Sequence, residues 1–135
     1  MSSKISKAAR KLIASRANFR CEYCRKPEII ANFGFHVEHI IGRQHGGTDR
    51  LSNLAYACSW CNWKKGPNIA TILFEGGDLL PLFNPRTNIW HEHFKVEEGL
   101  LIEKTDIAKG TIKLLAMNTV ELILERKALA EAGYF

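Results

Sequence analysis

The chain has 135 residues, of which 46% are hydrophobic and 24% charged. This composition is typical of a globular domain and excludes disordered, collagen-like and fibrous chains. The longest uncharged stretch, residues 51–63, is shorter than the roughly 20 residues that a membrane-spanning helix needs. Arg10 and Lys11 interrupt any apolar signal-peptide core, so we expect a cytoplasmic protein that makes no membrane contact.

The net charge of +5 conceals an uneven distribution. Residues 1–67 hold twelve Lys and Arg against four Asp and Glu, a net +8, whereas residues 68–135 hold seven against ten, a net −3. A basic half favours a polyanion partner such as DNA, although charge alone does not distinguish this from a solvated surface. We expect a basic core at 1–67 and a C-terminal extension at 68–135 packed on it as one compact domain, in a monomer or a homodimer.

A helix is predicted over residues 4–17, because small and apolar residues recur there at helical spacing. Lys4, Lys7 and Lys11 fall together on another face of this helix. They could follow a phosphate backbone, but the same pattern also fits an ordinary solvated face.

The middle of the chain is predicted as a strand, a loop, a second strand and a short helix: 35–41, 42–49, 54–57 and 59–65. The loop contains the pair Gly46 and Gly47, which favours a turn. Gly66 and Pro67 end the short helix.

The C-terminal half is predicted as a loop-rich stretch, a hairpin and two helices: 67–93, strands at 94–96 and 100–103, then 106–117 and 119–132. Thr105 is the predicted N-cap of the first helix. Asn118 is the predicted N-cap of the second, with Glu121 three residues on to complete a capping box.

The four cysteines form two Cys-x-x-Cys pairs: Cys21, Cys24, Cys58 and Cys61. Two such pairs supply four thiolates that can surround one zinc ion tetrahedrally. Disulfides are the competing account, but they are disfavoured in a cytosolic chain. A redox pair of the thioredoxin type lacks its βαβ context here. The spacing therefore favours a structural Zn²⁺ site.

Residues between and beside the cysteine pairs carry groups suited to phosphodiester hydrolysis. His39 can take a proton from water near neutral pH. Glu38 and Asn62 offer hard oxygen ligands for a catalytic divalent ion, Mg²⁺ or Mn²⁺, and Arg43 and Lys65 offer positive charge to a phosphate. Taken singly, each of these residues has an ordinary explanation as a packed side chain, a surface charge or a helix cap. Their combination inside a zinc-clamped frame favours a nuclease site.

Residues 18–67 resemble the HNH endonucleases, also called ββα-metal nucleases. The segment 35–40 is similar to the first strand of their motif, and 46–47 and 53–54 are similar to its middle glycines and asparagine. Residues 58–66 are similar to its closing CxxCNxxKG element. The C-terminal half resembles, more loosely, the extension of a bacterial subfamily of small stand-alone HNH proteins.

The resemblance implies an α+β fold with a ββα-metal centre clamped by a four-cysteine zinc site. It implies that His39 is the general base, that Glu38 and Asn62 hold the catalytic metal, and that Asn53 orients His39 through the loop backbone. Asn62 stands where many members have histidine, and Glu38 where aspartate is frequent. The activity implied is metal-dependent hydrolysis of DNA that leaves 5′-phosphate and 3′-hydroxyl ends.

Further side chains are candidates for contact with nucleic acid: His36, Arg43, His45, Lys64 and Lys65. Trp60, Trp63 and Trp90 could stack on bases, although tryptophans more often fill a core. Two other functions stay open. One is a zinc-stabilised nucleic-acid-binding module without catalysis, and the other is a zinc scaffold that binds a protein through its acidic half.

Overall fold

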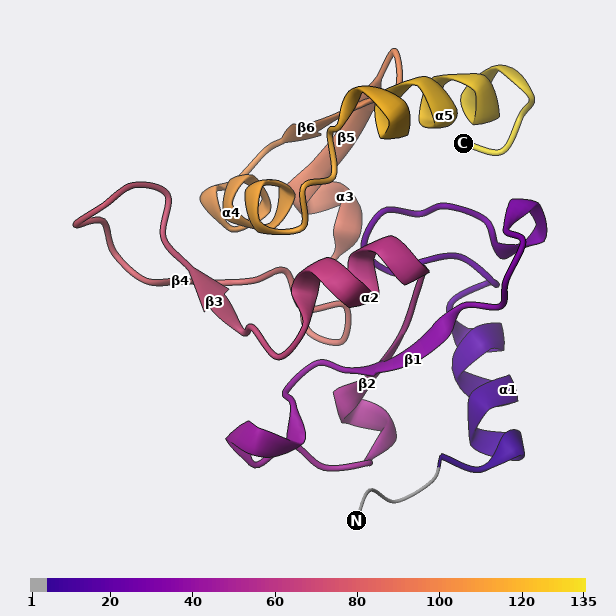
Figure 1. Cartoon of the computed structure of the whole chain (residues 1–135), viewed down its shortest axis with the longest axis vertical. Helices are drawn as coiled ribbons and strands as arrows, with labels where there is room; N and C mark the ends of the chain where they lie inside the picture. The colour runs from indigo at the N-terminus through magenta and orange to yellow at the C-terminus, as the bar shows by residue number, and fades with distance from the viewer. Residues whose placement is uncertain (1–4) are drawn as a thin grey trace. The chain divides into compact units, whose positions relative to one another are not determined.

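A computed structural model describes residues 5–135, which form two compact units with their boundary between Asn68 and Ile69. The architecture is mixed α+β, with five α-helices and three two-stranded antiparallel sheets in the described residues (Figure 1). The first unit contains α1 (Lys7–Arg16), η1 (Glu28–Ile30), β1 (His36–His39), η2 (Arg43–His45), η3 (Leu51–Asn53), β2 (Leu54–Ala57) and α2 (Ser59–Lys65). The second contains β3 (Ala70–Thr71), β4 (Leu80–Pro81), α3 (Trp90–His93), β5 (Phe94–Glu97), β6 (Leu100–Glu103), α4 (Asp106–Leu114) and α5 (Val120–Glu131).

The first unit is organised around a β-hairpin and the helix that follows it. β1 pairs antiparallel with β2, so that Glu38 lies opposite Ala55 and His39 opposite Leu54. All four residues of β2 are buried, and α1 packs against this strand. The guanidinium of Arg16 donates to the backbone oxygens of Leu51 and Leu54 and so ties α1 to the start of β2. The strand, strand and helix therefore form a ββα unit (Figure 1).

Helix α1 begins at Lys7 rather than at residue 4. The hydroxyl of Ser6 accepts a hydrogen bond from Ala9 N and caps the helix there. Lys4 lies outside the described residues. Strand β1 is shorter than predicted because beyond His39 the backbone bonds to Asn53: Ile40 N donates to its carbonyl and Ile41 N to its side chain.

In the second unit, α4 and α5 pack on β6 of the β5–β6 hairpin. Thr105 caps α4 as predicted. The N-cap of α5 is Thr119, so the assignment of Asn118 was wrong. Asn118 instead exchanges two side-chain hydrogen bonds with the backbone of Leu101. Buried Arg126 donates to three acceptors around it, the backbone oxygens of Gly99 and Met117 and Oδ1 of Asn118.

The helices of the described residues include none that combines the length and the apolar character needed to cross a bilayer.

Candidate metal centre and active site

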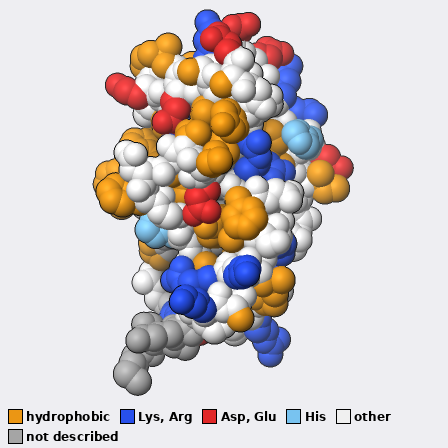
Figure 2. Space-filling view, turned by 90° about the vertical axis from the view of Figure 1, so that its right-hand side faces the viewer, with side chains coloured by type: hydrophobic (Ala, Val, Ile, Leu, Met, Phe, Trp, Pro, Cys, Tyr) orange, Lys and Arg blue, Asp and Glu red, His pale blue; other side chains and the backbone are white. Residues whose placement is uncertain are grey.

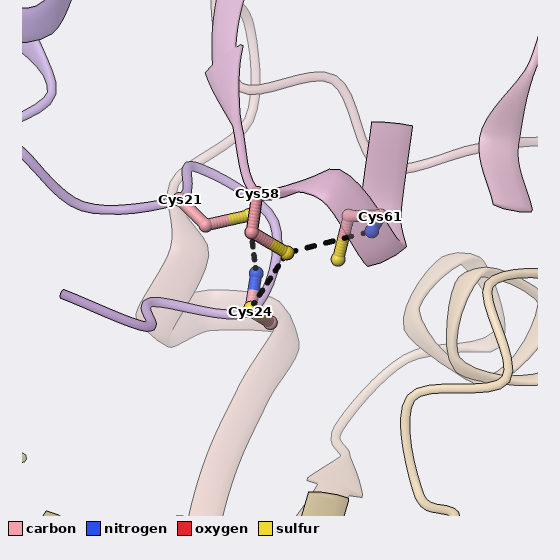
Figure 3. Close-up of side chains that lie close together, drawn as sticks. All are labelled: Cys21, Cys24, Cys58 and Cys61. Carbon is pink, nitrogen blue, oxygen red and sulfur yellow. Dashed lines mark hydrogen bonds between the residues drawn. The ribbon is translucent and has the colours of Figure 1, made fainter. Parts of the chain in front are cut away.

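The four cysteines meet in one buried cluster (Figure 3). Their sulfur atoms all lie within 4.8 Å of one another, and those of Cys24 and Cys58 are 3.8 Å apart. A tetrahedral zinc ion with Zn–S bonds of about 2.3 Å places its sulfur ligands about 3.8 Å from one another. All four thiols are free of disulfides. The cluster is therefore positioned to hold a metal ion, and its four sulfur donors suit zinc.

Backbone groups prepare the cluster for negative charge. Cys24 N donates to the sulfur of Cys21, and Cys61 N donates to the sulfur of Cys58, each over 3.4 Å. Hydrogen bonds from the other three thiols lower the pKa of Cys58 strongly, whereas hydrogen bonding with Cys21 and Cys58, together with burial, raises the pKa of Cys24. These hydrogen bonds thus favour the thiolate form of Cys58. A bound dication would stabilise all four thiolates.

A cleft of about 520 Å³ brings together residues from β1, the following loop and α2. Its lining includes Glu38, His39, Arg43 and Asn62, together with Trp63. β1 supplies the first two, η2 supplies Arg43, and the helix that begins after Cys58 supplies the last two. Four side chains predicted from the sequence for one site therefore share one cavity, which has room for a phosphate and a hydrated ion.

Glu38 is buried, and one oxygen of its carboxylate faces the ammonium of Lys65 without accepting a hydrogen bond of good geometry from residues 5–135. The hydroxyl of Tyr23 donates to Oε1 over 2.6 Å, and Oε2 lies 3.2 Å from Lys65 Nζ. Burial raises the pKa of Glu38, and the charge of Lys65 opposes that rise. A hard carboxylate oxygen, in a residue that lines a cleft, fits a divalent ion.

Lys65 does not reach the surface, and this corrects its predicted contact with phosphate. The residue is 1% exposed, and Nζ donates to the backbone oxygens of His39 and Ile40 while it pairs with Glu38. Its ammonium therefore holds the end of β1 in place and balances the charge of the buried carboxylate. The sequence identified Lys65 as a cation of the site but not as an internal one.

We expect Lys65→Met to lower the free energy of unfolding by about 3 kcal/mol or more, because removal of one partner leaves a buried charge uncompensated. Denaturant unfolding measures this change. The double variant Lys65→Met, Glu38→Gln should recover part of the loss, and the exposed Lys7→Met serves as the matched control. A single variant as stable as wild type would contradict the ion pair.

The ring of His39 is held by a carboxylate that the sequence analysis did not identify. His39 Nε2 and Arg43 Nη2 each lie 2.7 Å from Oδ1 of Asp49. An ionised carboxylate only accepts hydrogen bonds, so the contact places a proton on Nε2. In the neutral ring Nδ1 is then the basic atom. Asp49 follows the glycine pair and is one of only four acidic residues in 1–67. That position and that scarcity are the features of the sequence that point to a role for Asp49.

The loop that carries these residues is pinned by Asn53. Its Nδ2 donates to the backbone oxygens of Ile41 and Thr48, while its Oδ1 accepts from Ile41 N. Gly47 lies against the same strand end, where an added Cβ would come within 1.7 Å of the oxygen of Ile41. Asn53 thus closes the loop between β1 and η3. That it orients His39 stays a prediction.

If His39 acts as a general base in phosphodiester hydrolysis and Asp49 positions it, then Asp49→Asn should lower the turnover number by up to about 10²-fold, because small misplacements of a catalytic group are that costly. KM and the melting temperature should change little. Steady-state cleavage of a labelled DNA measures both constants. A variant with a raised KM and an unchanged turnover number would assign Asp49 to substrate binding instead.

The remaining candidates lie outside the cleft. His36 is exposed and its Nε2 lies 3.0 Å from the hydroxyl of Ser59, and His45 is exposed on η2. Lys64 lies over the rings of Trp60 and Trp63. Nucleic-acid contact by these three side chains stays a prediction.

The comparison with protein families gives one match, to the model described as HNH endonuclease, over residues 21–68. No match to a curated protein or to a solved structure was found. The matched segment runs from the first cysteine pair to the end of the first unit and contains every residue of the metal cluster and the cleft. Residues 21–68 of the first unit are therefore similar to the HNH endonuclease family.

Proposed function

We propose that this protein is a metal-dependent endonuclease that hydrolyses phosphodiester bonds of DNA. The observation that carries the proposal is the shared cleft, where a buried carboxylate, a carboxylate-held histidine and an asparagine amide line one cavity. A binding module needs no such set, because binding to DNA draws mainly on surface cations.

In this proposal each residue has one task. Glu38 and Asn62 hold a divalent ion, Mg²⁺ or Mn²⁺, which when bound supplies Lewis-acid stabilisation of charge on the phosphate. His39 accepts a proton from the attacking water at Nδ1, while Asp49 keeps its ring in place. Arg43 lines the cleft with a positive charge suited to a phosphate oxygen. The cysteine cluster holds a structural Zn²⁺ that fixes α2 and the segment around Cys21.

DNA as the substrate rests on the charge of the first unit. Several of its twelve cations donate hydrogen bonds to backbone oxygens of the fold, among them Arg16, Arg20 and Lys65. On α1, in contrast, Lys7, Arg10 and Lys11 are exposed. Figure 2 shows several Lys and Arg side chains lying close together on the face in view. Such exposed cations can displace counterions from phosphates.

Plasmid nicking tests the proposal directly. Supercoiled DNA is incubated with the full chain after treatment with a mild chelator, and then with added Mg²⁺ or Mn²⁺. We expect no cutting after chelation and recovered nicking with either ion, while zinc content and circular dichroism stay constant. A folded, zinc-loaded protein that binds DNA but cuts with no divalent metal would instead support a non-catalytic binding module.

A further inference from the structure

Trp63 lines the cleft, but the proposed hydrolysis assigns no role to its side chain. It is 70% exposed, although tryptophan is usually among the most buried residues, and it lines the cleft beside Asn62. Trp90, in contrast, is 5% exposed and stacks on Phe94 in the core of the second unit. Of the two, only Trp63 presents a broad apolar surface to solvent beside the candidate active site.

The indole of Trp63 is held in position by its neighbours on α2. Lys64 Nζ lies 4.5 Å from the centroid of its ring, and the rings of Trp60 and Trp63 form a T-shaped pair with centroids 6.0 Å apart. With 70% of the residue exposed, most of the indole surface stays open to solvent. The cation–π attraction between Lys64 and the indole favours this position of the ring and places a positive charge next to it.

We propose that Trp63 stacks on an unpaired base of the DNA held in the cleft, so that the protein selects sites where a base has left the double helix. The inference rests on the proposed function, because it takes the cleft as the place of the cut phosphate. Inside a duplex both faces of a base are covered by its neighbours, so an indole can stack only on a base released from them. Lys64 adds a cation suited to the adjoining phosphate. Single strands, gaps and mismatches are the substrates that meet this requirement.

Binding to oligonucleotides, measured by fluorescence anisotropy with a mild chelator that leaves the zinc in place, tests the proposal apart from catalysis. A single abasic site is moved along a single-stranded oligonucleotide of fixed length. For wild type we expect one position at which loss of the base weakens binding about 5-fold or more, the effect of removing one stacked base. Trp63→Ala should bind the intact strand correspondingly more weakly and should lose this position dependence.

Two more variants separate stacking from bulk. Trp63→Phe keeps an aromatic face and should retain most of the position dependence, whereas Trp63→Leu keeps apolar bulk and should lose it. Phe33→Ala removes another strongly exposed aromatic of the first unit that does not line the cleft, and it should bind as wild type does.

The outcomes are distinct. Equal abasic profiles for wild type and Trp63→Ala, or tighter wild-type binding to a fully paired duplex than to a mismatched one, would overturn the proposal. Because no exchangeable divalent ion is present, a protein that never cuts DNA can still pass this test. A protein that nicks plasmids can still fail it.

Discussion

Replacing Cys58 with serine should unfold the first unit or loosen it severely. Structural zinc contributes on the order of 10 kcal/mol to small metal-dependent folds, which is comparable to the whole stability of a typical domain, about 5–15 kcal/mol. Cys58 has a second role, because its sulfur caps α2 by accepting a hydrogen bond from Cys61 N. Replacement by serine removes the metal ligand without removing the cap. Serine is a good N-cap and keeps that contact. Zinc content and thermal unfolding by circular dichroism measure the result.

The control for this variant is the neighbouring Ser59→Ala. It removes the contact between an exposed hydroxyl and His36 and should leave zinc content unchanged. Stripping zinc from wild type with a strong chelator should reproduce the unfolding seen with Cys58→Ser. A reduced, folded wild type that contains no zinc would defeat the assignment of the cluster.

The limits of the elements around the metal cluster could be predicted, because residues adjacent in sequence determine where these elements begin and end. β2 and α2 have the predicted limits, since Cys58 caps the helix and Gly66 ends it at a positive φ of 51°. The predicted N-cap of α5 was wrong by one residue, because Asn118 and Thr119 are both residues that cap helices well. The choice between them depends on Leu101, a partner that is distant in sequence.

The limits of sequence reasoning are clearest at the cleft. The motif identified Glu38, His39 and Asn62, because residue type and order carry that information. It could not reveal that Lys65 turns inward, since its burial follows from how α2 packs on β1. Nor could it reveal that Asp49 faces His39, because that contact depends on how the loop closed by Asn53 folds back.

His39→Ala is the variant that best separates catalysis from structure. Loss of a general base slows a reaction roughly 10²–10⁴-fold, and we expect the nicking rate to fall within this range. The side chain is neither a ligand of the cysteine cluster nor part of the buried core. Zinc content, melting temperature and affinity for DNA should therefore stay near their wild-type values.

The matched control is His91→Ala, which removes an exposed histidine of the second unit and should nick DNA at the wild-type rate. All four measurements belong on one preparation of each protein. If His39 only packs the loop against Asp49, its replacement lowers the melting temperature, and lost nicking tracks lost folded protein. If His39 is the base, the folded variant binds DNA and cuts it slowly. Nicking at the wild-type rate by a stably folded His39→Ala protein would reject the base assignment, because no other cleft residue described here has an imidazole to take the proton from water.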